Sequence, residues 1–126
     1  MQRMSQPPEL PAKEVVLSKA LISVAKNLDL SQKELSEIIG SSKSEVSRLF
    51  NGKIYLSPYT KEGECALLLI RLYRSLDALL GEDEKQCQEW FKNDNEHLGE
   101  KPLVLSKKIE GLVEIVAYLD AMRGSA

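Results

Sequence analysis

The chain has 126 residues, of which 43% are hydrophobic, 29% are charged and 6% are aromatic. A chain of this length forms one compact domain or two very small ones. Its formal net charge of −2 excludes a globally cationic nucleic-acid coat and a polybasic membrane-binding protein, although a basic face on part of the surface is compatible with it.

The sequence has neither a membrane-spanning segment nor a paired-cysteine motif. Its longest uninterrupted apolar run covers only residues 65–70, and the N-terminus lacks the apolar core of a signal peptide. We therefore expect a cytoplasmic protein with no membrane partner. The spacing of Cys65 and Cys87 matches neither a metal site nor a redox pair, so we interpret both as buried apolar residues and expect no bound metal.

The N-terminal segment predicts an arm followed by a helix. Residues 1–12 contain three prolines and few apolar side chains, so they cannot bury enough surface to offset the entropy of ordering. We expect a flexible arm there. From Lys13 onward, apolar residues recur every three or four positions, which predicts an amphipathic helix that ends near Asn27.

Two short helices are predicted next. Ser31 and Glu34 have the spacing of a capping box, in which the hydroxyl accepts from the backbone N–H of the glutamate and the carboxylate reaches back. The helix that follows ends at Gly40, which suits a left-handed backbone. Either serine of residues 41–42 can cap the next helix, which ends at residues 51–52.

The second half of the chain predicts three further helices. The first starts at residues 57–58 and carries apolar residues on more than one face up to Gly81, so it must be covered on several sides. Acidic residues 82–84 favour the start of the next helix, which ends near Asn93. The spacing of Leu105 and the apolar residues after it describes a last helix that frays at its end. No segment has the pattern of a strand, so the predicted fold class is all-α.

Residues 30–53 have the spacing of a helix-turn-helix, in which a sharp glycine turn separates two crossing helices. The N-terminal part of the second helix in such a unit presents short or donor-bearing side chains to the bases of the major groove. Lys43, Ser44 and Arg48 are placed to do so, and flanking polar residues are placed to contact phosphates. The candidate DNA-binding residues are Gln32, Ser42, Lys43, Ser44, Ser47, Arg48, Asn51 and Lys53.

Capping boxes and glycine turns are common, so the same two helices also fit an ordinary part of a helical bundle. Charge favours DNA binding, since residues 1–60 carry a net charge of +2 and residues 61–126 one of −4. Because this basic excess is small, one copy would bind DNA modestly. We therefore expect a homodimer that presents two recognition helices to a palindromic double-stranded site.

Four parts of the helix-turn-helix segment follow one known pattern, Q-x-E-L-A, then G, then V-S-R, then N-G-K. They are Gln32-Lys33-Glu34-Leu35-Ser36, Gly40, Val46-Ser47-Arg48 and Asn51-Gly52-Lys53. In this respect the segment resembles the Xre and Cro family of helix-turn-helix domains. The resemblance implies a DNA-binding domain.

A second block of turn-forming and apolar residues begins at Trp90. Asn95 and Gly99 favour turns, and Pro102 fits the first turn of a helix, where its missing N–H is harmless. Gly111 lies inside the predicted last helix, where glycine costs about 1 kcal/mol relative to alanine. A glycine at this position suggests that another backbone approaches closely.

This block resembles the toxin-binding domain of the Xre/MbcA/ParS antitoxins, which pair with NAD-consuming RES-domain toxins. It departs from the family pattern at Glu100, where the family has a second glycine, and at Ser106, where it has leucine. With the helix-turn-helix added, the resemblance spans about residues 15–124 in the family's domain order. The matching residues of the block are Trp90, Asn95, Leu98, Gly99, Pro102, Leu103, Leu105, Gly111, Val116, Leu119 and Gly124.

The resemblance implies the antitoxin of a type II toxin–antitoxin system, which covers the active site of its toxin and represses its own operon by binding operator DNA. It divides the chain into an arm (1–12), a DNA-binding domain (13–58) and a helical dimerisation and toxin-binding domain (59–126). In the family, the C-terminal region blocks the toxin, so the end of the last helix is the implied blocking element. The residues implied to contact the toxin are Asn95, Leu98, Gly99, Lys101, Pro102, Tyr118, Met122, Arg123 and Gly124.

Three other functions fit parts of the sequence. A stand-alone transcriptional repressor would carry the same helix-turn-helix and would dimerise through the exposed part of residues 59–80. A pure protein-contact scaffold would follow if Glu45 prevented DNA binding by repelling phosphate. An enzyme is disfavoured, because the only histidine, His97, lies in a polar turn without a nucleophile, phosphate-binding or metal motif. We expect no catalytic activity and no cofactor.

Overall fold

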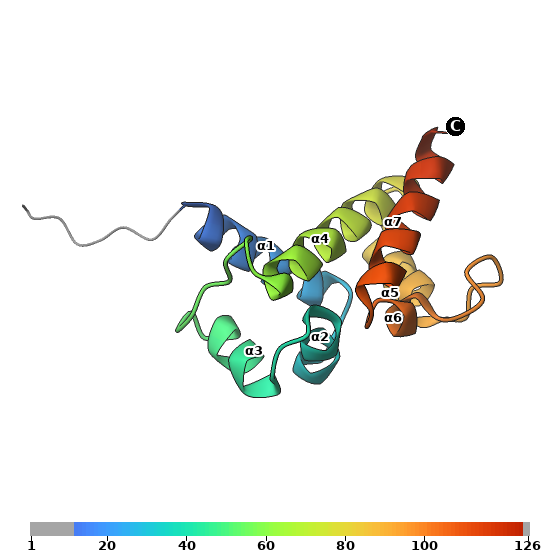
Figure 1. Cartoon of the computed structure of the whole chain (residues 1–126). Helices are drawn as coiled ribbons and strands as arrows, with labels where there is room; N and C mark the ends of the chain where they lie inside the picture. Colours follow the sequence, from blue (N-terminus) through green and yellow to red (C-terminus); the bar gives the residue numbers. More distant parts are fainter. Residues whose placement is uncertain (1–11, 125–126) are drawn as a thin grey trace, which may run out of the picture.

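The computed structural model describes residues 12–124, and within that range it contains helices and one isolated bridge, between Asn95 and Glu100. The predicted all-α class is confirmed. The predicted arm lies outside the described residues except for Ala12, the first residue of α1. The helices are α1 (Ala12–Asn27), α2 (Gln32–Ile39), α3 (Lys43–Phe50), α4 (Lys61–Leu79), α5 (Glu84–Lys92), α6 (Pro102–Leu105) and α7 (Ile109–Gly124) (Figure 1).

The predicted termini of α2 and α3 are confirmed. The Ser31 hydroxyl accepts from the Glu34 N–H at 3.0 Å, while the Glu34 carboxylate accepts from the Ser31 N–H at 2.9 Å. Ser42 caps α3 in the same reciprocal way. Gly40, with a φ of 74°, ends α2 in the left-handed region, where a residue without a Cβ is favoured. These short-range signals produce the turn between α2 and α3.

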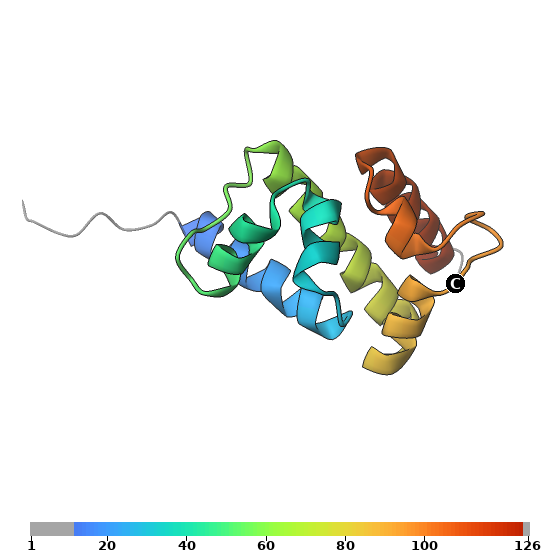
Figure 2. The ribbon, with the colours of Figure 1, turned by 90° about the horizontal axis from the view of Figure 1, so that it is seen from below.

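Helix α4 is the central element of the fold. It contacts α1, α2, α5 and α7, so the expectation that it must be covered on several sides is confirmed. Figure 2 shows α4 running between α1 and α7, with α2 and α3 toward its start and α5 after its end. Leu69, Leu72 and Leu76 are at most 1% exposed, and burial of each stabilises the fold by about 1.5–3 kcal/mol. One core cluster therefore extends from α1 to α7.

The start of α4 differs from the prediction. The helix begins at Lys61 and not at residues 57–58, because the Thr60 hydroxyl caps it by accepting from the Gly63 N–H at 3.0 Å. The segment before the cap packs directly on the helix, since a Cβ on Gly63 would lie 1.8 Å from the Ser57 carbonyl oxygen. The chain at 57–58 is therefore a connection that lies on α4 and not part of it.

The predicted last helix is broken into two. Leu105 ends α6, and α7 begins at Ile109 after a turn in which the Lys108 N–H donates to the Leu105 carbonyl at 3.2 Å. The close backbone approach predicted at Gly111 is confirmed, since a Cβ there would lie 1.9 Å from the Leu105 carbonyl oxygen. The continuous apolar spacing concealed this break, because residues on both sides of it face the same core.

Both cysteines are buried and free, as predicted. Burial raises the pKa of the Cys87 thiol to about 11 and raises the pKa of Cys65 as well. Each thiol therefore stays protonated at neutral pH and packs as a small apolar group. None of the helices in residues 12–124 is long and apolar enough to span a membrane.

Replacing Gly111 with alanine should destabilise the protein. Alanine favours a helix interior by about 1 kcal/mol, but its methyl group would overlap the Leu105 carbonyl, and overpacking against backbone costs about 1–3 kcal/mol. We expect a lower urea midpoint for Gly111→Ala. Gly124→Ala is the matched control, because a Cβ at Gly124 meets open space. Equal stability of the two variants would contradict the close approach.

Candidate functional site

Helix α3 presents a polar, basic face to solvent. Val46 and Leu49 are at most 3% exposed and hold the opposite face against the core, because they recur at i and i+3. Lys43, Ser44 and Arg48 are exposed. This outward orientation is the one that a recognition helix needs, since its side chains must reach base edges in the major groove.

The capping of α3 occupies two of its polar side chains. The Ser42 hydroxyl accepts from the Glu45 N–H at 3.0 Å, and the Glu45 carboxylate accepts from the Ser42 N–H at 3.2 Å. The Ser42 hydroxyl is therefore already hydrogen-bonded at the start of the helix, which leaves it less available to contact DNA. The Glu45 carboxylate is engaged at the cap of α3 and is exposed to solvent.

The remaining predicted DNA-binding residues flank α3. Gln32 is the first residue of α2 and is half-buried, as is Ser47. Asn51 is the C-terminal cap residue of α3, and the Lys53 N–H donates to the Arg48 carbonyl at 2.9 Å. Lys43, Arg48 and Lys53 are exposed, and none of these cations takes part in an ion pair among the described residues. Their charges are available to phosphates.

The loop between α5 and α6 is ordered by its own turn residues. The Asn95 side-chain oxygen accepts from the Leu98 N–H at 3.0 Å, and its backbone carbonyl accepts from the Gly99 N–H at 2.8 Å. The positive φ of 79° belongs to Gly99. Glu100 is not among the described residues with positive φ, so this departure from the family pattern imposes no backbone strain.

The residues implied to contact toxin lie on this loop, on α6 and on the second half of α7. The rings of His97 and Tyr118 are 5.9 Å apart, which joins the loop to α7. Pro102 is buried at the first turn of α6, so it shapes the surface without being part of it. Leu98, Asn95 and Tyr118 are half-buried, whereas Gly99, Lys101, Met122, Arg123 and Gly124 are exposed.

A polar network fixes the last turns of α7 on α4. Asp120 accepts from Arg71 at 2.5 Å and from the Ser75 hydroxyl at 3.1 Å, and the Arg123 guanidinium donates to the Ser75 oxygen at 3.1 Å. The hydrogen bond from Arg71 lowers the pKa of Asp120, so its carboxylate is ionised at neutral pH. The network therefore holds Arg123, one of the implied toxin contacts, in a defined position.

Sequence reasoning missed this network and the tight packing at Gly63. Ser75 is 2% exposed between buried leucines of α4. A polar residue inside an apolar helical stripe was the one available signal, because a buried hydroxyl needs a partner. The identity of that partner depends on how α4 and α7 pack across each other, and the local sequence pattern does not specify that arrangement.

Two features of the described residues bear on catalysis, namely whether they include a metal site and where His97 lies. Within residues 12–124, no group of three His, Cys, Asp or Glu side chains could hold a metal ion. His97 is exposed and stacked near Tyr118. The exposed polar residues named above lie on the α3 face and on the surface formed by the α5–α6 loop and the end of α7.

Two family models match the chain, one for each half. Residues 9–71 match the antitoxin Xre-like helix-turn-helix domain. Residues 75–124 match the antitoxin Xre/MbcA/ParS C-terminal toxin-binding domain. The first match covers half of the chain, and together the two include every helix except a short part of α4. The comparison with curated proteins found no match.

Proposed function

The chain belongs to the Xre/MbcA/ParS-type antitoxins, and on this premise we propose that it neutralises a RES-domain, NAD-consuming toxin and represses its own operon. The observation that carries the proposal is the presence of both units in one chain, at 9–71 and 75–124. A DNA-binding unit beside a toxin-binding unit provides for neutralisation and autoregulation in a single protein. The protein then acts in the cytoplasm, where its operator lies.

The DNA-binding role rests on the exposed face of α3. Lys43, Ser44 and Arg48 would contact base edges, and Asn51 and Lys53 would contact phosphates from the turn that follows. Gln32, Ser42 and Ser47 complete the proposed surface, with Ser42 also capping the helix. The modest number of cations predicts modest affinity for each copy, which favours two copies on one operator.

A groove between α1 and α4 supports the proposed homodimer. Val16, Tyr59 and Leu67 are 65%, 78% and 46% exposed, and all three line this groove of about 440 Å³. Exposed apolar side chains that gather in one place are typical of a protein contact. A symmetric dimer would cover them and present two α3 helices to DNA.

The toxin-binding role rests on the exposed end of α7 and the adjoining loop. Asn95, Leu98, Gly99 and Lys101 would form the loop side of the contact, with Pro102 shaping it from beneath. Tyr118, Met122, Arg123 and Gly124 would form the α7 side and cover the toxin's active site. Steric occlusion needs no catalytic group on this chain, and we propose that it is not an enzyme and uses no cofactor.

Arg48→Ala should weaken operator binding. A base-contacting arginine contributes about 1–3 kcal/mol at one operator position, so the variant should bind less tightly and lose discrimination at that position. The measurement is fluorescence anisotropy on DNA from the chain's own promoter. Lys19→Ala on α1 removes one exposed cation outside the helix-turn-helix and is the charge-matched control. An unchanged affinity for Arg48→Ala would refute the assigned reading face.

A chain that ends at Ala121 should bind the toxin but fail to neutralise it. It keeps Leu119, the last core residue of α7, and Asp120, which bonds to α4, so we expect it to fold. It lacks Met122, Arg123 and the residues after them. NAD consumption by the toxin, measured at equal concentrations of the two proteins, should persist. Full neutralisation by this shortened chain would overturn occlusion by the C-terminal end.

A further inference from the structure

Basic residues of the C-terminal unit, matched at 75–124, are concentrated in one short segment. The unit contains eleven acidic and six basic residues, and three of those six are the lysines of residues 101–108, a segment without an acidic residue. This segment forms α6 and the turn before α7, residues 106–108. Residues 82–100, which include α5 and the loop after it, contain seven acidic residues and two lysines. The turn before α7 is therefore the part of this unit to which an anionic partner is attracted.

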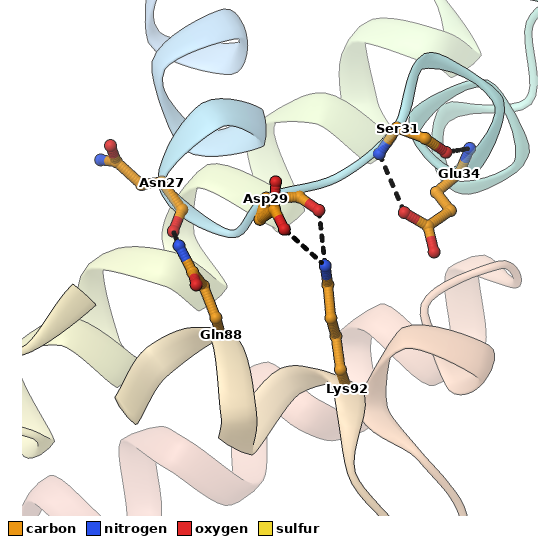
Figure 3. Close-up of polar contacts among 6 residues, drawn as sticks. All are labelled: Asn27, Asp29, Ser31, Glu34, Gln88 and Lys92. Atoms are coloured by element: carbon orange, nitrogen blue, oxygen red, sulfur yellow. Dashed lines mark hydrogen bonds and ion pairs between the residues drawn. The ribbon is translucent and has the colours of Figure 1, made fainter. Parts of the chain in front are cut away.

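Two polar contacts join the C-terminal unit to the helix-turn-helix, in addition to the core that they share. The Lys92 ammonium of α5 donates to the Asp29 carbonyl, in the connection between α1 and α2, at 2.5 Å (Figure 3). The second contact joins the turn before α7 to α2, since the Lys107 ammonium lies 3.1 Å from the Glu37 carboxylate. The turn before α7 therefore has a defined place next to α2.

The two lysines that precede α7 line a groove against α2 and the start of α4. This groove has a volume of about 300 Å³. Glu37 and Gly40 lie on its α2 side, and Lys61 comes from the first turn of α4. Lys107 and Lys108 line it from the turn before α7. The groove is therefore built by residues of both the helix-turn-helix domain and the C-terminal unit.

The groove lies on the side of the molecule that presents α3. Gly40 belongs to the turn between α2 and α3, three positions before Lys43 at the start of α3. Figure 1 shows α3, α2 and α6 in a row below α4, and Figure 2, which looks at the molecule from below, shows the same order. A duplex that receives α3 in its major groove continues along this side, and each of its strands carries a phosphate about every 3.4 Å. Phosphates that flank the bases read by α3 would then lie beside the groove.

The groove carries an excess of positive charge. Lys61 and Lys108 are exposed, and neither takes part in an ion pair among the described residues. The carboxylates of the groove are Glu37, which is paired with Lys107, and Glu110 in the first turn of α7. Three ammonium groups against two carboxylates leave a net positive charge, which is the sign needed to bind a phosphate group.

We propose that Lys61 and Lys108 bind the phosphate backbone of operator DNA beside the bases that α3 reads. The inference rests on the proposed function, because it needs α3 to dock on DNA. The ion pair between Lys107 and Glu37 keeps Lys108 next to α2. The C-terminal unit then contributes to operator affinity without reading sequence, because phosphate contacts carry no base information.

The test measures the salt dependence of DNA binding by the purified full-length chain. Fluorescence anisotropy on promoter DNA gives the slope of log K against log salt concentration, whose magnitude falls by about 0.9 for each phosphate contact that is lost. The double variant Lys61→Gln and Lys108→Gln should have a slope shallower by about 2. Its affinity should fall by the same factor on promoter DNA and on a duplex of scrambled sequence, because the lost contacts are to phosphates.

Two control variants separate the phosphate contact from folding and from general charge. Lys61→Arg with Lys108→Arg keeps both cations and should keep the wild-type slope. Lys19→Gln with Lys85→Gln removes two exposed cations from α1 and α5. This control should also keep the wild-type slope, because neither residue lines the groove. All variants should unfold at the wild-type urea midpoint, since every substituted side chain is exposed.

Failure of the phosphate contact and failure of the proposed function give different results. A wild-type slope in the Lys61→Gln and Lys108→Gln variant, while Arg48→Ala loses discrimination between promoter and scrambled DNA, would overturn the contact alone. The contact would also be overturned if the double variant kept its slope but bound the co-purifying toxin less tightly, since the lysines would then belong to the toxin interface. Absence of binding by the wild-type chain to either duplex would overturn the proposed DNA-binding function, and the contact with it.

Discussion

The burial of α4 on several sides is the constraint on which the rest of the structure depends. Its apolar residues occupy more than one face, so α1, α2, α5 and α7 must cover it from several sides. The two family matches meet on this helix, at 71 and 75. They share one hydrophobic core. The two units therefore fold as one cooperative domain and not as two domains joined by a linker.

The candidate DNA-binding and toxin-binding surfaces are formed by capping and packing interactions around this shared core. Reciprocal capping at Ser31 and Ser42 starts two short helices, and the buried residues of α3 leave Lys43 and Arg48 outside. At the other end, the missing side chain of Gly111 lets α6 lie against α7. The Asp120 network then fixes the last turns of α7. Each candidate surface is thus held in place by capping, packing and side-chain hydrogen bonds.

Short-range features of the fold could be predicted from the sequence, and long-range ones could not. The capping boxes, the left-handed Gly40 and the close approach at Gly111 each follow from residues near in sequence. The break before Ile109 was missed because α6 and α7 share one apolar spacing. The hydrogen bond from the Lys92 ammonium to the Asp29 carbonyl joins residues that are 63 positions apart, and nothing near either residue in the sequence indicates its partner. Such contacts depend on how helices cross around α4.

The most direct test of the account is an affinity purification of the tagged chain from its native host, with each co-purifying protein identified and quantified. The account predicts a RES-domain protein in near-stoichiometric amount. It also predicts that NAD consumption by that protein appears only after the two are separated. Recovery of the chain alone, or with DNA only, would contradict it. The chain would then be a stand-alone repressor that uses the same α3 face without a toxin partner.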